Sequence, residues 1–320
     1  MLSTLAAAQA SVTGSAPGRS LARRALPALH ISTTPPRIPA PGSCGAPYTV
    51  LPIPQAAQNA LPHLRRRSYS GGMSHTTALS AIAFMRRLHA DRITVDDVAD
   101  HVGYSPAHFS RAFAQVTSLS PGQYLAAVRF DAAKRLLLAE DFAVSEVCAA
   151  VGFDSLPTFT RRFSRAVGTT PAALRRLAES VGEQPPRPFE QARGRHAPVR
   201  VRIRYPDDGW GGADTWLGWY PQPAPIGLPA AGVLLRDREL VDLPLCPGNP
   251  WLLAFVVPPA AQVSDHFALG RPVVAVHRTP LTAPLPAGAE VALDLGPAPG
   301  TSAPLLSALP VLWAQERRNG

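Results

Sequence analysis

The apolar positions of the chain follow two different periods in two successive regions. In LSAIAFMRRLHA, which begins at Leu79, apolar side chains recur three or four positions apart, the spacing that places them on one face of an α-helix. Thr94 then precedes VDDVADHV, as expected of a residue that caps a helix, and Gly103 follows as a stop. Because this pattern of helical spacing, capping residues and glycine stops continues to about Ala178, we predict an all-α domain over residues 73–180.

After a Pro- and Gly-rich stretch, which we interpret as a linker over residues 181–195, apolar and basic residues alternate in VRVRIRY. Alternation with a period of two is typical of a strand with one buried face. TWLGWY, AAGVLL, WLLAFVV, RPVVAVH and AEVALDL follow, separated by Pro, Gly or Asp. About six or seven short strands in this order predict a small all-β sandwich over residues 196–316, and hence a multidomain chain.

Residues 1–72 contain ten prolines and no persistent apolar period. Because proline interrupts helices and restricts the residue before it, we expect a disordered tail. Two alternatives stay open: an organelle transit peptide, since this region carries Arg and Ser but no acid, and a translation start at Met73. No apolar run approaches the roughly 20 residues that span a bilayer, so no membrane partner is expected.

The net charge of +9 is unevenly distributed along the chain. Residues 1–72 carry seven Arg and no acid, residues 73–180 carry twelve bases and ten acids, and residues 181–320 carry twelve of each. The helical domain is therefore nearly neutral, and bulk charge does not identify a nucleic-acid partner. Three scattered cysteines give neither a zinc spacing nor a disulfide framework, which favours a reducing compartment; we expect Cys148 in the core.

The helical domain contains an internal repeat. VADHVGYSPAHFSRAFAQVTSLSP, which begins at Val98, aligns with VCAAVGFDSLPTFTRRFSRAVGTTP, which begins at Val147. Each copy places Gly and an aromatic residue between two helical segments, then two Phe residues four positions apart and a Pro eight positions later. A short helix, a tight turn and a second helix in this order predict a helix-turn-helix in each copy.

The residue types within each copy fit their expected places. Gly103 and Gly152 stand where the first helix ends and the backbone needs a left-handed residue. Ser105 in the first copy, and Asp154 or Ser155 in the second, are expected to cap the second helix. The buried stripe of that helix then contains a Phe pair, Phe109 with Phe113 and Phe159 with Phe163.

The opposite face of each second helix carries mainly small residues and one arginine. Small side chains allow close approach to a major groove, and arginine can bind guanine through two hydrogen bonds. A solvated surface is the alternative for any single arginine, but Arg111 and Arg161 occupy equivalent places in the two copies. The faces consist of Ala107, Ser110, Arg111 and Ala114 in the first copy, and of Leu156 or Pro157, Thr160, Arg161 and Ser164 in the second.

The segment PGQYLAAVRFDAAKRLLLAE between the copies predicts a helix of about 18 residues, about 27 Å long. Such a helix can hold two reading helices near the roughly 34 Å repeat of B-DNA, so that both enter successive major grooves. Arg129, Lys134 and Arg135 project from it, and phosphate contact and plain solvation are both open for them. Arg162 and Arg165 of the second copy are further candidates for phosphate contact.

This region resembles the carboxy-terminal DNA-binding domain of the AraC/XylS family of bacterial regulators. The matching stretches are VADHVGYSPAHFSRAF, PGQYLAAVRFDAAKRLL and VGFDSLPTFTRRFSRAVGTTPAALRR, about 100 of 320 residues. The resemblance implies a double helix-turn-helix that binds double-stranded DNA and regulates transcription, usually as an activator. It implies base contacts by Ala107, Ser110, Arg111, Leu156, Pro157, Thr160 and Arg161.

Two features depart from the usual pattern of that family. Leu156 and Pro157 replace more usual polar residues and offer only apolar contact, such as with a thymine methyl group, so the second unit is expected to grip chiefly phosphates. The β-domain follows the reader, whereas most members place a sensing or dimerising domain before it. Its strand pattern resembles a transthyretin-like or carboxypeptidase-regulatory sandwich, and effector sensing, dimerisation and contact with another protein stay open as its role.

An enzyme is the rival class of function, and the residues give it little support. The β-domain has no metal-ligand spacing, nucleophile elbow or Gly-rich phosphate loop, so we expect no catalytic activity, cofactor or metal. We interpret Asp265-His266 as a loop pair rather than a catalytic dyad, and GWGG from Gly209 as a turn. A cluster of aromatic residues fits a carbohydrate- or small-molecule-binding module, or else the sandwich core: Trp210, Trp216, Trp219 and Tyr220.

The expected partner is double-stranded DNA. RNA polymerase, an unidentified small-molecule effector and a second copy of the chain are further candidate partners, in a bacterial cytoplasm. The residues themselves do not distinguish an activator from a repressor.

Overall fold

The structure is a computed structural model, and it describes residues 72–139, 141–181, 188–191, 198–206, 209–259, 261–282, 285 and 289–319. The predictions made for the tail before residue 72, and for most of the linker, fall outside these residues. The helical and the β parts belong to one compact unit.

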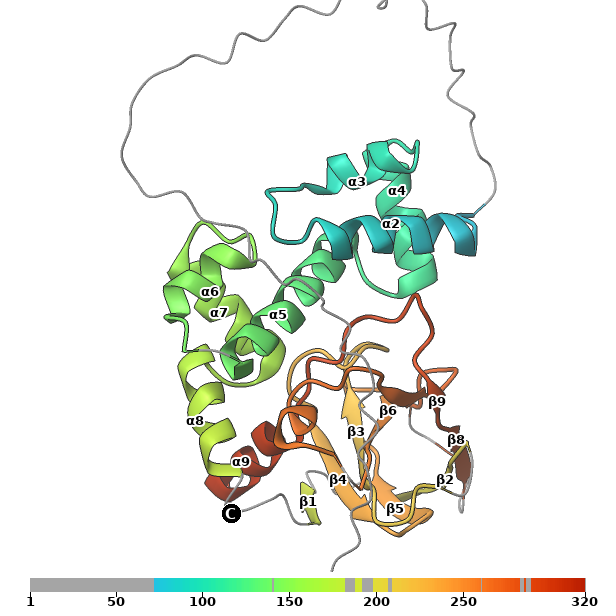
Figure 1. Ribbon diagram of the computed structural model, residues 1–320. Coiled ribbons are helices and arrows are strands. Elements are labelled where there is room, and N and C mark those ends of the chain that lie inside the picture. The colour runs from blue at the N-terminus through green and yellow to red at the C-terminus, as the bar shows by residue number, and fades with distance from the viewer. Residues whose placement is uncertain are drawn as a thin grey trace, which may run out of the picture. The chain divides into compact units, whose positions relative to one another are not determined.

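The helical part contains two small helix groups joined by one long helix (Figure 1). The first group consists of α2 (His75–Arg87), α3 (Val95–His101) and α4 (Pro106–Thr117). The long helix is α5 (Pro121–Ala139). The second group consists of α6 (Val144–Ala150), α7 (Leu156–Val167) and α8 (Pro171–Val181). The all-α region predicted from the helical period is therefore confirmed.

Side chains at the helix ends explain where α3 begins. Thr94 Oγ1 accepts a hydrogen bond from the backbone N–H of Asp97 at 3.3 Å, and the Asp97 carboxylate accepts one from the backbone N–H of Thr94 at 2.7 Å. These hydrogen bonds lower the pKa of Asp97 below its usual value. The capping role expected of Thr94 is confirmed.

Each helix group has its own apolar core. Phe109, Phe113 and Tyr124 are fully buried in the first, together with Ile82, Met85 and Val98. Phe159 and Phe163 are fully buried in the second, where both rings pack against Phe130 of α5. Cys148 is buried in this second core, as predicted.

The β part forms two sheets among the described residues. The larger has the order β1 (Phe189–Gln191), β4 (Ala231–Arg236), β3 (Asp214–Tyr220), β6 (Trp251–Val257), β7 (Val273–Val276) and β9 (Gly296–Pro297). The smaller has the order β5 (Leu240–Pro244), β2 (Pro198–Arg204) and β8 (Glu290–Asp294). Only the β2–β8 pair is parallel among the pairs in the described residues.

The alternating strands pack as two layers. Val199, Val201 and Ile203 of β2 point into a core shared with Leu217 and Trp219 of the larger sheet. The period of two in VRVRIRY therefore marked a half-buried strand, whereas β3, buried at every residue, has cover on both faces. The prediction of two packed layers of short strands agrees with this arrangement, while its transthyretin-like type is not tested.

Two elements correct the expectation of an all-β region behind a plain linker. Residues Leu309–Asn319 form helix α9, whose Leu309 and Leu312 pack with Trp216 on the face of the larger sheet that lies away from the shared core. Within the expected linker, Phe189–Gln191 forms strand β1, which pairs with β4. Strand β1, with three residues, is too short for a clear period, whereas Leu309 and Leu312 of α9 have the three-residue spacing of a helix face.

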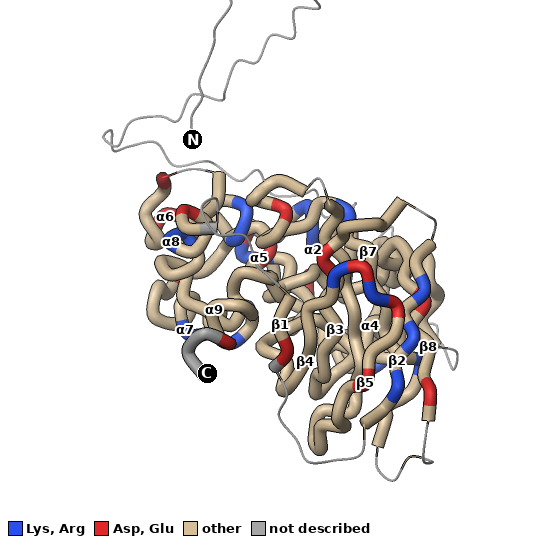
Figure 2. Tube along the Cα trace, turned by 90° about the horizontal axis from the view of Figure 1, so that it is seen from below, with Lys and Arg blue, Asp and Glu red and all other residues tan. Residues whose placement is uncertain are grey.

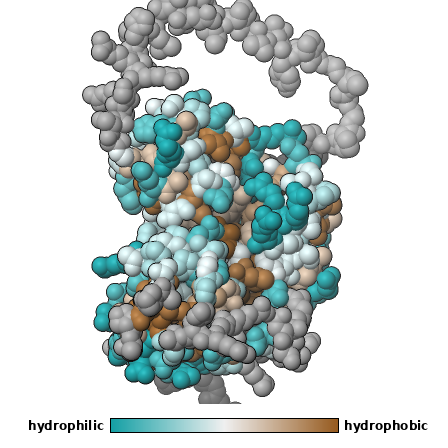
Figure 3. Space-filling model, turned by 180° about the vertical axis from the view of Figure 1, so that it is seen from behind, coloured by the Kyte–Doolittle hydropathy of each residue, from teal (hydrophilic) through white to brown (hydrophobic). Residues whose placement is uncertain are grey.

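The surface carries mixed polar and apolar residues. On the face shown in Figure 3, apolar residues gather in small groups among hydrophilic ones. Among the described residues, no helix combines the length and the apolar character needed to cross a membrane.

Candidate DNA-binding surface

The two helix-turn-helix units share the same turn. Gly103 and Gly152 have φ angles of 73° and 78°, the left-handed backbone expected of them. The aromatic residue that follows donates its backbone N–H back into the preceding helix, Tyr104 to Ala99 O and Phe153 to Cys148 O. This shared hydrogen bond sets the direction in which α4 and α7 leave the turn.

The second helix of each unit is fixed by its buried Phe pair. The ring centroids of Phe109 and Phe113 are 5.2 Å apart, and those of Phe159 and Phe163 are 5.5 Å apart. All four side chains are fully buried. The face of α4 and α7 that remains outside is therefore determined by the same two positions in both units.

The outer faces contain the seven residues predicted to contact bases. Ala107, Arg111 and Arg161 are exposed, while Ser110 and Thr160 are half-buried. Leu156 and Pro157 are also exposed, Leu156 to 40 %. Neither Arg111 nor Arg161 makes an ion pair or a side-chain hydrogen bond with any described residue. Both guanidinium groups are thus free to meet a ligand.

The helix starts differ between the units. Ser155 Oγ accepts a hydrogen bond from the backbone N–H of Thr158 at 3.4 Å, so Ser155 rather than Asp154 caps α7. Asp154 instead forms an ion pair with Arg92, 2.8 Å away. Ser105 stands at the corresponding place before α4 but makes no capping hydrogen bond, which corrects the expectation for that residue.

Lys134 corrects the prediction of phosphate contact or solvation. Its side chain is fully buried, and Nζ donates hydrogen bonds to Leu305 O at 2.9 Å and to Leu306 O at 3.3 Å. Burial lowers the pKa of Lys134 to about 8. The residue faces inward because it continues the buried row of Phe130, Ala133 and Leu137 on α5. That spacing was readable in the sequence, although the segment that covers Lys134 was not.

Arg129 is half-buried and holds the loop after α2. Nε donates to His89 O and Nη2 to Asp91 O, each at 2.8 Å, and the guanidinium lies 5.7 Å from the ring centroid of Phe153. Backbone acceptors of this loop thus satisfy part of its guanidinium, and the phosphate contact expected of it stays a prediction.

The other three phosphate candidates have different surroundings. Arg135 is exposed, pairs with Asp131 at 3.1 Å and donates to Leu269 O at 3.2 Å. Arg162 and Arg165 are exposed on α7, and Arg162 lies 5.7 Å from the Phe153 ring centroid. None of these contacts tests whether the three residues bind phosphate.

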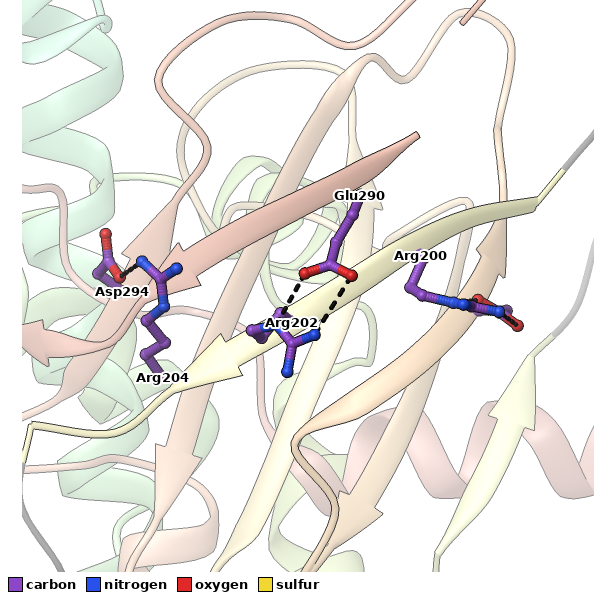
Figure 4. A network of polar contacts seen from close by, with 6 residues as sticks. Arg200, Arg202, Arg204, Glu290 and Asp294 are labelled. Atoms are coloured by element: carbon purple, nitrogen blue, oxygen red, sulfur yellow. Dashed lines mark hydrogen bonds and ion pairs between the residues drawn. The ribbon is translucent and has the colours of Figure 1, made fainter. Parts of the chain in front are cut away.

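The arginines of β2 are paired with acids of neighbouring strands. Arg200 pairs with Asp242, Arg202 with Glu290 and Arg204 with Asp294 (Figure 4). Figure 2 shows these opposite charges close together on β2 and β8. Because each of these guanidinium groups faces a carboxylate, this row on β2 is neutral and gives a polyanion no net attraction.

The residues considered for other functions of the β part have structural surroundings. Asp265 accepts a hydrogen bond from the backbone N–H of Gln262 at 3.0 Å and so caps the short helix η1 (Val263–His266), and His266 is half-buried. Trp216, Trp219 and Tyr220 are fully buried, which removes them from any carbohydrate platform. Among the described residues, no group of three or more His, Cys, Asp or Glu side chains could hold a metal ion.

Comparison with known proteins places these geometric features in a family. A family model described as a helix-turn-helix domain matches residues 98–177. The transposon Tn10 TetD protein of Escherichia coli is 31 % identical over 109 residues, which cover 34 % of this chain and 79 % of that protein. The chain belongs to the AraC/XylS family.

Other relatives of the AraC/XylS type match the same region. The uncharacterized regulator YobQ of Bacillus subtilis is 34 % identical over 102 residues, 32 % of this chain and 42 % of that protein. The activator AarP of Providencia stuartii is 29 % identical over 85 residues, 27 % of this chain and 63 % of that protein. The matches thus span less than two thirds of these two relatives. The shared part is the AraC-type helix-turn-helix domain, so the chain contains a DNA-binding domain of that type.

Proposed function

We propose that the chain recognises a specific promoter sequence by placing α4 and α7 in successive major grooves of double-stranded DNA. The observation that carries this proposal is the equivalence of two unpaired, exposed arginines, Arg111 and Arg161, on helices whose opposite faces are fixed by the same Phe pair. The α5 helix of 19 residues, about 28 Å long, is of suitable length to separate two such helices.

The two reading helices have unequal roles in this proposal. Arg111 binds guanine in the first groove, where Ala107 and Ser110 allow the helix to come close. In the second groove Arg161 and Thr160 provide polar contacts, whereas Leu156 and Pro157 offer only an apolar surface for a thymine methyl group. Arg135, Arg162 and Arg165 are proposed to contact phosphates, which fixes the register but carries no sequence information.

We further propose that the carboxy-terminal part holds the two reading units at a fixed separation. Ile226 packs against the cores of both units. Tyr124 of the first unit donates its hydroxyl to Ser302 O at 2.7 Å. Gly227 N donates to Ala166 O at 2.7 Å, and Gln315 Nε2 donates to Gly168 O at 3.1 Å, both at the end of α7. Contacts on both sides of α5 oppose its bending.

The remaining roles follow from the family and are part of the same proposal. Activation of transcription through contact with RNA polymerase is supported by the relative AarP, whose name describes it as a transcriptional activator. In this proposal the chain acts as a homodimer in the bacterial cytoplasm. A carboxy-terminal part that binds a small molecule, with DNA binding as its output, is the second candidate function and is favoured by a cavity of about 510 Å³ between α4 and the larger sheet.

The test uses the full chain, because the carboxy-terminal part completes both helical cores. Genomic DNA fragments are selected on the purified protein, and the affinity for the enriched site is compared with that for a scrambled site at several salt concentrations. We expect the specific site to bind at least about a thousand times more tightly than the scrambled one. Equal binding to both sites at every salt concentration contradicts the proposal, because a protein that contacts only phosphates behaves in that way.

A further inference from the structure

A cavity of about 510 Å³ lies between the end of α4 and the larger sheet. Its volume is within the range of sites for small organic molecules. One wall is the final turn of the first reading helix, Val116, Thr117 and Ser118. Other walls are the segment around Pro223 and Pro225 and the segment from Gly296 to Ala303.

The floor of the cavity is the face of the larger sheet that points away from the shared core. Side chains of β6 alternate between the two faces, so Leu252, Ala254 and Val256 belong to the core. Leu253 and Phe255 line the cavity with their β7 partners Val276 and Val274. Trp251, at the start of β6, lines it as well. Val276 remains 40 % exposed, so its side chain is accessible to a ligand from the cavity. The floor is apolar and contains a flat indole ring.

The charged groups at the cavity leave one unpaired cation. Asp294 lines it but is paired with Arg204 at 3.2 Å. His277 lines it, and its Nδ1 lies 2.7 Å from Thr279 O. Arg278 is exposed, and no described residue forms an ion pair or a hydrogen bond with its guanidinium. An anionic group is therefore the partner that this end of the cavity lacks.

We propose that this cavity binds a small aromatic organic anion, whose ring lies on Trp251, Leu253 and Val276 and whose acid group meets Arg278. The proposal deepens the proposed function and rests on it, since the occupant regulates DNA binding. Ser302 lines the cavity and accepts the hydrogen bond of Tyr124, and the end of α4 forms its opposite wall. A bound anion thus contacts both the first reading helix and the segment that holds it. A difference in affinity between DNA-bound and free protein follows if either wall moves on DNA binding.

The first arm of the test measures binding without DNA. The probe is 8-anilinonaphthalene-1-sulfonate, an aromatic anion whose fluorescence rises in an apolar site, titrated into the full chain. R278M removes the cation, and V276W fills the cavity from a side chain that is already partly exposed. R238M, another exposed arginine, is the matched control. We expect saturable binding, weakened about tenfold in R278M, absent in V276W and unchanged in R238M. Equal binding by the parent and both cavity variants, with unchanged unfolding midpoints, overturns the proposal.

The second arm measures DNA binding with and without the probe. We expect the probe to change the affinity of the parent for its selected site several-fold and to leave that of V276W unchanged. A site that binds the probe with no effect on the DNA affinity of the parent overturns the regulatory part of the proposal. Failure of the proposed function itself is seen separately, as loss of sequence preference in the protein without probe.

Discussion

The ammonium group of Lys134 lies 2.9 Å from the carbonyl oxygen of Leu305, a residue 171 positions further along the chain. This contact ties α5, the helix between the two helix-turn-helix units, to the segment that precedes α9. It also leaves an ammonium group fully buried with carbonyl oxygens, and no carboxylate, as its hydrogen-bond partners among the described residues. Burial shifts the protonation equilibrium of this amine toward the neutral form in the folded state, so the stability of the fold depends on pH.

We expect the free energy of unfolding to rise between pH 8 and pH 10. Burial lowers the pKa of Lys134 from 10.5 to about 8, so in this window the unfolded chain holds a proton that the folded chain has lost. The gain contributed by Lys134 is up to about 3 kcal/mol. Between pH 10 and pH 12 Tyr220 lowers the free energy of unfolding as the pH rises. Burial raises the pKa of Tyr220 to about 12, so in this window the folded chain keeps a proton that the unfolded chain has lost.

Urea unfolding at pH 7, 8, 9 and 10 measures this dependence, and the difference between the parent and K134M isolates Lys134 from other titrating groups. R135M is the control: Arg135 is exposed beside Lys134, so we expect the free energy of unfolding of R135M to rise with pH as in the parent. Parallel curves for the parent and K134M would show that the amine is not buried as described.

Substitution of the two equivalent turn glycines is expected to have unequal effects. Both have positive φ angles, so Ala costs about 1 kcal/mol at either position through backbone strain. A Cβ at Gly103 meets no atom within 4 Å, whereas one at Gly152 lies 2.8 Å from His89 O and 3.0 Å from Ala90 O. We expect G152A to cost about 2–4 kcal/mol in total. Thermal or urea unfolding of both variants checks this, and equal losses would mean that the loop after α2 gives way freely.

The matched arginines give a prediction about specificity. R111A is expected to weaken binding to the selected site by about 1–3 kcal/mol and to relax the preference at one base pair, and R161A to do the same in the second groove. R162A serves as the comparison, because loss of a phosphate contact weakens all sequences alike and reduces the salt dependence by about one charge. Binding is measured by fluorescence anisotropy on sites that differ at single positions. A uniform loss in R111A would assign Arg111 to phosphate instead.

Ile226 tests whether the carboxy-terminal part fixes the separation of the reading units. I226A removes contacts to both helical cores and is expected to lower the free energy of unfolding by about 1–3 kcal/mol. Because the separation then varies, affinity for a site with both grooves is expected to fall more than affinity for either half alone. V263A, at a side chain 39 % exposed, is the control. Equal losses on whole and half sites would contradict the proposed role of Ile226.

Much of the reading domain was determined by local sequence. The Gly-aromatic turn, the Phe pair and the capping Thr94 act within a few residues of themselves, and each took the conformation that its neighbours imposed. The internal repeat made these signals stronger, because the same order of helix, Gly-aromatic turn and Phe pair begins at Val98 and again at Val147. The outward faces of α4 and α7 then followed from helical geometry alone.

Other features depended on segments far apart in the sequence. Local spacing shows that Lys134 shares a face with Phe130, but only the segment around Leu305 decides that this face is covered. In the same way the sequence shows Arg129 only as a cationic side chain on a helix. The tertiary structure brings the loop at His89 close to it, and this loop supplies hydrogen-bond acceptors for its guanidinium. The sequence determined the two helix-turn-helix units and their outward faces, since turns and helix faces are set by neighbouring residues. Tertiary structure decided which cations remain outside, since burial depends on contacts between distant segments that no local period contains.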